Sequence, residues 1–384
     1  MKGFKNAKIY VEGKGIVTTC LGIENGKIAY IGDDESKIDE LIANVPEGSI
    51  VLPGFIDEHI HGAAGSDAMD GEVTALSTIA NAIASEGTVA FLATTMTQSP
   101  KNLLKAMKAV KDYRKSDPAD GAEVAGVHLE GPFISTKHVG AQPIKYVKAP
   151  DVEFFDKLNK ASGNNIRIIT MAPEVEGSDA FIKAVSEKGV VVSIGHTDAK
   201  YDDIVKAIEC GAKNVTHTYN AQRALHHREA GTVGSALLLD ELNCELITDT
   251  IHVSVPAMKL VFKNKPADKV TLITDAMRAK HMPDGESELG GQLVIVKGGE
   301  ARLVDGTLAG SVLKMNDAIK NVVTKVGVPF LRAVDSATIN PAKTLGIDNK
   351  LGSIKVGKNA SFAIMNVDYS IEATIRNGKV IYSK

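Results

Sequence analysis

The sequence predicts an α/β protein whose core is a closed (β/α)8 barrel of the TIM type, with a small β-sandwich domain built from both chain termini. Through the middle of the 384-residue chain, short apolar runs alternate with longer amphipathic stretches, which is typical of βα repeats. Eight such runs occur, the number that closes a barrel. Most of them end in side chains able to bind metal or move protons.

The two ends of the chain carry similar turn signals. Asn25-Gly26 and Asn377-Gly378 each lie between β-type segments, and Asn-Gly tolerates the positive φ values of a type I′ hairpin turn. We therefore predict a hairpin over Val17–Ile31 and strands over Ala360–Tyr382. Two unrelated hairpins are the alternative, but chain ends often lie close together. The predicted β domain comprises residues 1–52 and 350–384, and the predicted barrel comprises residues 53–349.

The barrel elements follow in chain order. The predicted strands are Ile50–Asp57, Val89–Thr94, Val124–Glu130, Ile166–Ala172, Val190–His196, Val215–Tyr219, Cys244–Asp249 and Val270–Asp275. The predicted helices between them are Val73–Glu86, Leu103–Arg114, Phe154–Ala161, Ala180–Lys188, Ile204–Cys210 and Val255–Asn264. A doubly wound open sheet is the alternative, but it would not gather its first and last strand ends around one point. In a barrel, the C-terminal ends of all strands ring one mouth.

Composition and charge narrow the classes of function. Lys plus Arg is 44 and Asp plus Glu is 47, so the formal charge is 44 − 47 = −3. This balance excludes a strongly basic nucleic-acid binder. The N-terminus lacks a signal peptide's apolar core, and no apolar run reaches the ~18 residues that span a bilayer. Cys20, Cys210 and Cys244 show no CxxC spacing, so we expect reduced thiols in a cytoplasmic protein without a membrane partner.

Six side chains at strand ends are candidate metal ligands: His59, His61, Glu130, His196, His217 and Asp275. The first two histidines lie two apart, so on a strand both point to one side and can chelate one divalent ion. Taken singly, each histidine is more often a structural residue, and Glu130 suits a salt bridge. Their joint position at the predicted barrel mouth favours a metal site.

A divalent metal supplies the chemistry that such a site would perform. It lowers the pKa of bound water and polarises a carbonyl oxygen. Asp275 is the predicted proton shuttle, because an amide nitrogen must be protonated to leave. No Gly-x-Ser-x-Gly elbow and no Cys beside a candidate catalytic His occurs, which disfavours covalent hydrolysis.

A second cluster, Asn220–Arg228, follows His217 closely. Its four cationic or ionisable side chains at a barrel mouth suit a phosphate or a carboxylate, whereas a solvated loop is the ordinary reading of a charge run. His252 would donate to the same anion or to the carbonyl oxygen. Leu308–Ser311, a turn of small residues before a helix, would wall a pocket for a small acyl group.

Several segments together resemble a known family. They are PGFIDEHIHG (Pro53–Gly62), HLEGPF (His128–Phe133), GHT (Gly195–Thr197), THTYNA (Thr216–Ala221), TDAM (Thr274–Met277) and the ending over Ala337–Phe362. They resemble the amidohydrolase superfamily and, within it, the N-acetylglucosamine-6-phosphate deacetylase family. HxH occurs in many amidohydrolases, whereas the combination of HLEGPF, THTYNA and TDAM is much more specific.

The resemblance implies hydrolysis of N-acetyl-D-glucosamine 6-phosphate to D-glucosamine 6-phosphate and acetate, in amino-sugar catabolism and cell-wall sugar recycling. It implies one metal ion on Glu130, His196 and His217. A second ion would lie on His59 and His61, with Glu130 as a bridge and Asp275 as the acid/base. One or two zinc or iron ions per subunit are therefore expected. Some members carry Gln for the first histidine of HxH, a later His, and one metal. Here HxH is intact and Gln142 stands at the later position, which indicates the two-metal branch.

The resemblance also implies the substrate contacts. Arg228 and His252 would meet the sugar phosphate, with Arg228 reaching across the interface of a homodimer. Asn220 and Ala221 would contribute further phosphate contacts. The remaining predicted contacts are Ala141, Gln142, Leu308 and Ala309.

Two other hypotheses remain open. One is a dihydroorotase-like or isoaspartyl-dipeptidase-like enzyme, which often uses a carboxylated lysine as bridging ligand, but the segment Ile166–Glu174 contains no lysine. The other is a barrel without catalysis that serves as a scaffold, because fold alone does not prove activity. Such a protein would be expected to have lost metal ligands.

Overall fold

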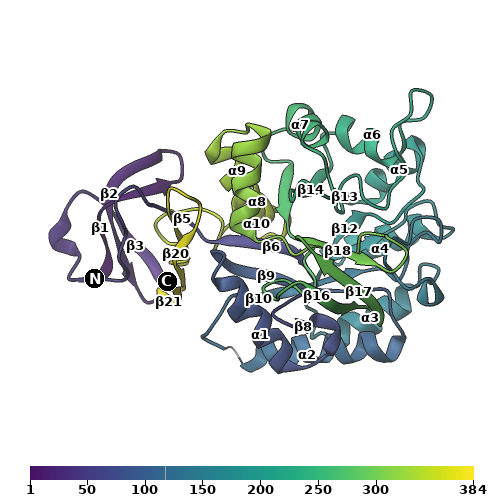
Figure 1. The fold of residues 1–384 in the computed structure, drawn as a ribbon, viewed down its shortest axis with the longest axis horizontal. Coiled ribbons are helices and arrows are strands. Elements are labelled where there is room, and N and C mark those ends of the chain that lie inside the picture. Colours follow the sequence, from purple (N-terminus) through teal and green to yellow (C-terminus); the bar gives the residue numbers. More distant parts are fainter. Residues whose placement is uncertain (117) are drawn as a thin grey trace.

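The computed structural model describes residues 1–116 and 118–384. Figure 1 shows a barrel with helices around it and, beside the barrel, a smaller β unit in which both chain termini lie. None of the helices in these ranges combines the length and the apolar character that crossing a bilayer requires. The limits between the two units stay a prediction.

The smaller unit is one mixed sheet that both ends of the chain build. Its strands are β1 (Lys2–Val11), β2 (Gly15–Glu24), β3 (Lys27–Gly32), β4 (Glu40–Leu41), β5 (Ile50–Pro53), β19 (Phe362–Met365), β20 (Ile371–Arg376) and β21 (Lys379–Ser383). The order is β21-β20-β19-β5-β1-β2-β3, and β4 pairs with β1. Phe4 and Phe362 pack edge to face at 5.7 Å in its separate apolar core.

The two Asn-Gly turns are confirmed, and they lie next to each other. Asn25 and Gly26 have φ values of 51° and 73°, and Asn377 and Gly378 have 50° and 75°, as a type I′ turn requires. The N–H of Ala360 donates to the Gly26 carbonyl, and the N–H of Gly378 donates to the Ala360 carbonyl, each at 2.8 Å. The alternative of two unrelated hairpins is therefore wrong.

The larger sheet is the predicted parallel barrel. Its strands are β6 (Phe55–Ile60), β9 (Thr88–Thr95), β10 (Glu123–Glu130), β11 (Ile166–Met171), β12 (Val191–Ile194), β13 (Ala212–Val215), β14 (Asn243–Ile247) and β15 (Val270–Ile273). Their order is β15-β14-β13-β12-β11-β10-β9-β6. The first and last strands meet, because the N–H of Asp275 donates to the His59 carbonyl at 2.8 Å and the N–H of His61 donates to the Ala276 carbonyl at 2.9 Å. These bonds exclude the open-sheet alternative.

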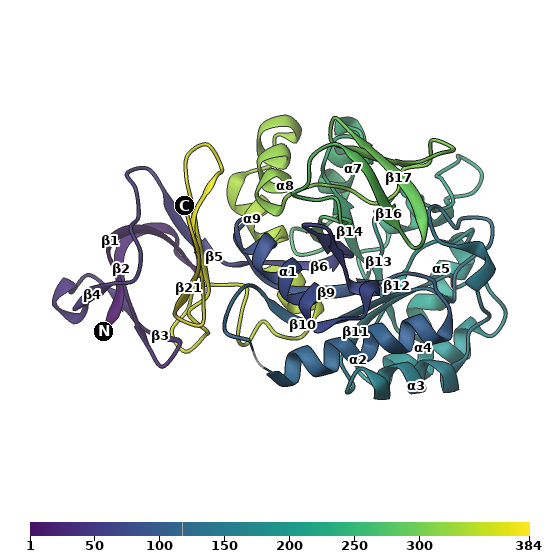
Figure 2. The same cartoon turned by 60° about the horizontal axis from the view of Figure 1, so that its bottom comes forward.

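Helices cover the outside of the barrel (Figure 2). They are α1 (Val73–Ala84), α2 (Pro100–Ser116), α3 (Val152–Ala161), α4 (Ser178–Ser186), α5 (Tyr201–Cys210), α6 (Gly231–Leu238), α7 (Val255–Asn264), α8 (Met315–Asn321), α9 (Phe330–Ser336) and α10 (Ile339–Thr344), with the short turns η1 (Glu35–Lys37), η2 (Ala68–Asp70), η3 (Ile144–Tyr146) and η4 (Val322–Val326). All six predicted helices are present, with ends shifted by a few residues. Helices α6, α9 and α10 were not predicted, whereas α8 is the helix expected after the turn Leu308–Ser311.

Two predicted strands need correction. Ile50–Asp57 is not one strand, because β5 pairs with β19 in the terminal sheet whereas β6 pairs with β9 in the barrel. Val215–Tyr219 is also wrong, since β13 ends at Val215. The following residues cannot continue the ladder, because His217 and Tyr219 adopt positive φ values of 29° and 85°.

Five short strands outside the two large sheets lie near the barrel mouth. They are β7 (Gly62–Ala63), β8 (Ser66–Asp67), β16 (Gly285–Leu289), β17 (Gln292–Lys297) and β18 (Glu300–Leu303). The last three form an antiparallel sheet whose inner face, including Leu289 and Val294, packs on Met96 and Met277. This sheet was not predicted, and it forms one wall beside the strand ends.

A buried ion pair fixes the turn that follows β15. The Glu86 carboxylate lies 2.8 Å from Nζ of Lys280, and it accepts hydrogen bonds from the His281 ring at 2.7 Å and the Met315 N–H at 2.9 Å. Burial tends to raise the pKa of Glu86, but Lys280 and His281 lower it below its ordinary 4.5. The stabilisation from Glu86 is therefore present above that pH and is lost as the pH falls further.

We expect Glu86→Gln to lower the free energy of unfolding by about 3–5 kcal/mol, because the Lys280 ammonium would stay buried without a counter-charge. Urea denaturation at pH 7, followed by circular dichroism, measures the change. Glu72→Gln is the matched control, since Glu72 forms an exposed pair with Lys105 at 3.5 Å that contributes little. Equal, small effects of the two substitutions would contradict the prediction.

Candidate metal centre

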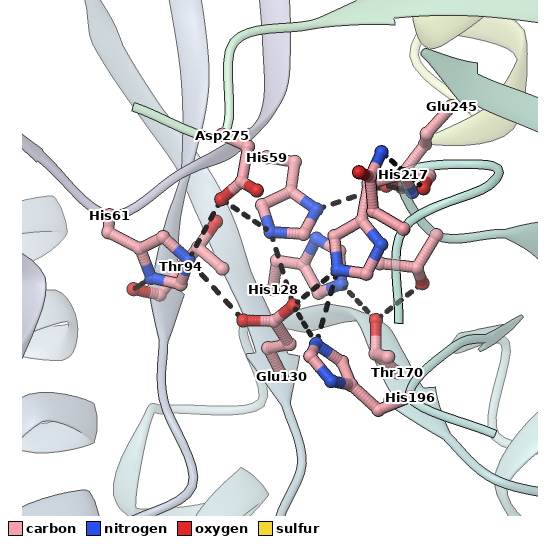
Figure 3. A network of polar contacts seen from close by, with 12 residues as sticks. His59, His61, Thr94, His128, Glu130, Thr170, His196, His217, Glu245 and Asp275 are labelled. Atoms are coloured by element: carbon pink, nitrogen blue, oxygen red, sulfur yellow. Dashed lines mark hydrogen bonds and ion pairs between the residues drawn. The ribbon is translucent and has the colours of Figure 1, made fainter. Parts of the chain in front are cut away.

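The structure brings all six predicted ligands together at the barrel mouth (Figure 3). Each follows or ends a different strand, apart from the first pair: His59 and His61 belong to β6 and its end, Glu130 ends β10, and His196, His217 and Asp275 follow β12, β13 and β15. All six are buried, with at most 8% of any residue exposed. Residues more than two hundred positions apart therefore share one site.

Glu130 lies at the centre of the group. Its Oε1 is 3.1 Å from Nε2 of His196 and 3.1 Å from Nε2 of His217. Its Oε2 is 3.3 Å from Nε2 of His61. On the other side, Oδ1 of Asp275 lies 3.2 Å from Nε2 of His61 and 3.5 Å from Nε2 of His59. The candidate ligands thus form two halves, one with His196 and His217 and the other with His59, His61 and Asp275, and Glu130 contacts both.

Three of the ligands have backbone in the left-handed region. The φ values are 48° for His196, 29° for His217 and 48° for Asp275. Such conformations are unfavourable for residues with a Cβ and persist where the surrounding structure enforces them, often at functional sites. A side chain at Gly195 would approach the Thr216 Cβ to 2.7 Å, so glycine is required there.

Three of the four candidate histidine ligands have rings that are oriented through their Nδ1 atoms. Nδ1 of His61 donates to the Thr94 carbonyl at 3.3 Å, and Nδ1 of His196 donates to the His138 carbonyl at 2.9 Å. Nδ1 of His59 lies 3.0 Å from Oε2 of Glu245. Glu245 was not predicted, although an acidic residue inside the apolar strand β14 was a signal for it. In each ring, Nε2 is left to face the centre.

Charge at the centre is strongly coupled. Burial lowers the pKa of His59, but Glu130, Asp275 and Glu245 raise it to about 9. Burial raises the pKa of Asp275, but His59 and His61 lower it to about 2. Burial raises the pKa of Glu130 as well, but the surrounding imidazoles hold it well below its ordinary value. The carboxylates are therefore ionised and create a site that favours positive charge.

These residues fit a divalent metal ion. His59, Glu130 and His217 offer ligand atoms within 4.8 Å of one another, and so do His59, His61 and Asp275. Nε2 of His59 is buried and has no hydrogen-bond partner among the described residues. A buried nitrogen without a partner is unfavourable unless it meets a cation or a donor.

A third grouping, of His59, His128 and Glu245, does not fit a metal as well. Nδ1 of His128 lies 3.0 Å from the Glu58 carbonyl, and its Nε2 lies 2.7 Å from the Thr170 hydroxyl. Burial and the neighbouring His59 lower the pKa of His128 to about 4. His128 is therefore a neutral, hydrogen-bonded residue beneath the centre.

A cavity of about 200 Å³ opens onto the ligands. It is lined by six of the predicted substrate contacts, namely Ala141, Gln142, Asn220, Ala221, His252 and Leu308, by Gly310 of the predicted turn Leu308–Ser311, and by the unpredicted residues Met96, Gly140, Leu289 and Thr307. Larger cavities of about 770 and 400 Å³ have no ligand of this centre in their walls. Of these three cavities, the smallest is therefore the candidate substrate site, because candidate metal ligands line it.

The remaining predicted contacts lie elsewhere. Ala309 is buried beneath the three-stranded sheet, where its N–H donates to the Ala301 carbonyl at 2.9 Å. Arg228 is exposed outside the cavity, and its guanidinium lies 2.8 Å from the His227 ring. Gln142 and His252 line the cavity and also contact acidic side chains. Gln142 donates to Oε2 of Glu130 at 2.7 Å, so it supports a candidate ligand. His252 pairs with Asp249 at 2.6 Å.

Comparisons with known proteins agree with this geometry. A model of the amidohydrolase family matches residues 50–381. The chain is 39% identical over 383 residues to N-acetylglucosamine-6-phosphate deacetylase of Bacillus subtilis (98% of this chain, 96% of the relative). It is 41% identical over 360 residues to the enzyme of that name from Lysinibacillus sphaericus (93% and 92%). It is also 36% identical to N-acetylgalactosamine-6-phosphate deacetylase of Escherichia coli O157:H7 (90% and 90%).

Solved structures show the same architecture over the whole chain. N-acetylglucosamine-6-phosphate deacetylase from Thermotoga maritima superposes with a TM-score of 0.90 at 33% identity and full coverage of both chains. A variant of the Mycobacterium smegmatis enzyme in complex with N-acetyl-D-glucosamine-6-phosphate gives a TM-score of 0.91 at 27% identity, covering 100% of this chain and 99% of that one.

Proposed function

Since this chain belongs to the amidohydrolase family, we propose that it hydrolyses the acetamide of N-acetyl-D-glucosamine 6-phosphate to D-glucosamine 6-phosphate and acetate. The observation that carries the proposal is the buried group of ligands around Glu130, which faces a cavity of about 200 Å³. Its near relatives bear the name of this activity. The reaction would take place in amino-sugar catabolism and cell-wall sugar recycling.

The family is metal-dependent, and the residues would hold up to two ions, for which we propose zinc or iron. Glu130, His196 and His217 would hold one ion, and His59, His61 and Asp275 would hold the other with Glu130 between them. When bound, a divalent ion lowers the pKa of a water molecule and polarises the amide carbonyl. Imidazole and carboxylate donors do not distinguish zinc from iron by type alone.

Asp275 is the proposed proton carrier. Its ionised carboxylate faces the cavity, so it can accept a proton from the attacking water and return it to the leaving amine nitrogen. Without that transfer, the amide nitrogen would have to leave as an anion. Positioning of the acetamide would fall to His252 beside the carbonyl oxygen or the phosphate, and to Leu308 and Leu289 at the acyl methyl.

We further propose that the protein acts as a homodimer. Arg228 does not line the cavity of its own chain and stands on an exposed loop, so it would reach the sugar phosphate in the partner's site. Asn220 and Ala221 line the cavity of the same chain and would complete the phosphate contacts. Three free thiols support a cytoplasmic location.

We expect Arg228→Ala to raise KM for the 6-phosphorylated sugar about tenfold or more, because a charge-assisted bond to the phosphate is lost. KM for unphosphorylated N-acetylglucosamine should barely change. Steady-state kinetics on the two substrates measure the difference, with Lys188→Ala as the control, because Lys188 is an exposed cation that pairs with Asp156 at 2.8 Å away from the cavity. Equal effects on both substrates would refute the phosphate role of Arg228.

The test of the whole proposal is acetate release by metal-depleted and reconstituted protein. Activity should be lost on depletion and return with added zinc or iron. A dihydroorotase-like reaction is disfavoured, because β11 has no lysine to carboxylate and Glu130 would take the bridging position. A scaffold role predicts no metal after purification, whereas the deacetylase predicts one or two equivalents.

A further inference from the structure

Glu245 is a buried acid on β14 that the proposed reaction does not use directly. It is completely buried, and its carboxylate is hydrogen-bonded on both oxygens. Oε2 accepts from Nδ1 of His59 at 3.0 Å and from the backbone N–H of His217 at 3.3 Å. Oε1 accepts from Nδ2 of Asn214 at 2.8 Å. One carboxylate therefore contacts a residue from each half of the ligand set (Figure 3).

We propose that Glu245 is a positioning residue that fixes the ring of His59 and thereby sets the affinity of the ion held by His59 and His61. This inference rests on the proposed function only in that the centre binds metal. It assigns to Glu245 neither contact with the substrate nor a proton transfer.

The partners of the other histidines show why Glu245 differs from them. His61 and His196 each donate from Nδ1 to a neutral backbone carbonyl, and Nδ1 of His217 has no partner among the described residues. His59 is the one of the four whose Nδ1 faces a carboxylate. An anionic acceptor holds the proton on Nδ1, keeps the Nε2 lone pair directed at the centre, and makes the imidazole a stronger donor to a cation.

The carboxylate is itself held in place. Asn214, which donates to Oε1, also donates to the Ser193 hydroxyl at 3.1 Å and accepts from Nδ2 of Asn243 at 2.6 Å. The Thr271 hydroxyl donates to Asn243 at 3.2 Å. These bonds join β12, β13, β14 and β15 beneath the mouth. They fix the Glu245 rotamer, so the position of the His59 ring is determined by the barrel.

The bond to His217 links Glu245 to the second ligand group. His217 has φ of 29°, a conformation that its surroundings must stabilise, and Glu245 accepts its backbone N–H. The His217 ring is nevertheless placed by its own contacts with Glu130 and His196, at 3.1 and 3.2 Å. Loss of Glu245 should therefore lower the affinity for the ion held by His59 and His61 more than the affinity for the ion held by His196 and His217.

The experiment compares Glu245→Ala and Glu245→Gln with the wild type in the full-length protein. Zinc equivalents are counted by elemental analysis, and zinc affinities are measured by competition with a chromophoric chelator. For Glu245→Ala we expect one of the two zinc affinities, that of the ion held by His59 and His61, to fall about 10–100-fold and the other to change much less. The d–d spectrum of the cobalt-loaded protein should lose intensity from one of its two sites.

Glu245→Gln separates geometry from charge and guards against a variant that fails to fold. The amide oxygen can still accept from His59, but its NH2 group would face the NH2 group of Asn214. The double variant Glu245→Gln/Asn214→Asp restores complementary donors and acceptors, and it moves the negative charge to the neighbouring side chain at position 214. We expect it to recover part of the zinc affinity lost in Glu245→Gln.

Cys244→Ala is the matched control, because Cys244 is equally buried and adjacent on β14, with its thiol 3.6 Å from the Ala236 carbonyl. It should leave both zinc affinities unchanged. Wild-type zinc affinity in Glu245→Ala, equal losses in Glu245→Ala and Cys244→Ala, or a wild type that is fully active with one ion would each overturn the role of Glu245. A wild type that binds zinc but releases no acetate would instead refute the proposed function.

Discussion

Asp275→Asn should lower kcat for acetate release by about a thousandfold while the protein keeps its fold and at least one metal ion. Asparagine preserves the shape of the side chain, but its amide cannot accept the proton of the attacking water. Oδ1 of Asp275 lies near the Nε2 atoms of His59 and His61, whereas the proposed second ion would be held by Glu130, His196 and His217, which the substitution leaves unchanged. Steady-state assays of acetate release, with elemental analysis of the same samples, test both parts of the prediction.

The control for this substitution is Asp335→Asn, because Asp335 lies in the wall of another cavity and accepts a hydrogen bond from Tyr10 at 2.8 Å. It should leave kcat at the wild-type value. If Asp275→Asn retained a near-normal rate with its metal in place, the proton-carrier role of Asp275 would be refuted. Loss of all metal would show that Asp275 acts mainly as a ligand.

Glu130→Gln should remove measurable turnover, with a loss of about 10⁴-fold or more, together with most of the bound metal. Of the two carboxylates among the candidate ligands, Glu130 is the one that contacts ligands of both groups, and a neutral amide binds a divalent ion far less well. The side-chain NH2 group of the new glutamine would also face the NH2 group of Gln142, which in the wild type lies 2.7 Å from Oε2 of Glu130. Elemental analysis and acetate release measure the two losses.

Chelation of the wild type provides the comparison for Glu130→Gln. Metal-depleted wild type should be as inactive as Glu130→Gln but should recover when zinc or iron is returned, whereas the variant should not. Thermal unfolding of both samples reports whether the fold survives. A metal-free wild type with undiminished acetate release would contradict the metal-dependent mechanism as a whole.

Local sequence determined the elements and most of the candidate ligands. The eight-run pattern predicted the barrel strands, because parallel strands buried on both faces need apolar residues throughout. The Asn-Gly turns at 25–26 and 377–378 could be predicted locally, because Asn and Gly tolerate the positive φ values that a type I′ turn needs. His59, His61, Glu130, His196, His217 and Asp275 were recognisable because polar residues directly after buried strands are expensive to bury without a partner.

The tertiary structure decided what depends on contacts between distant segments. The strand predicted at Val215–Tyr219 ended early, because His217 turns into a left-handed conformation and its ring lies beside Glu130 and His196. Glu245 was hidden within an apolar strand until its carboxylate could be placed beside the His59 ring, and Arg228 proved to lie outside its own cavity. Apolar periodicity is written in neighbouring residues, so the sequence alone could predict the barrel. Which donor faces which acceptor depends on the register of eight strands closing into a ring, and only the folded chain specifies it.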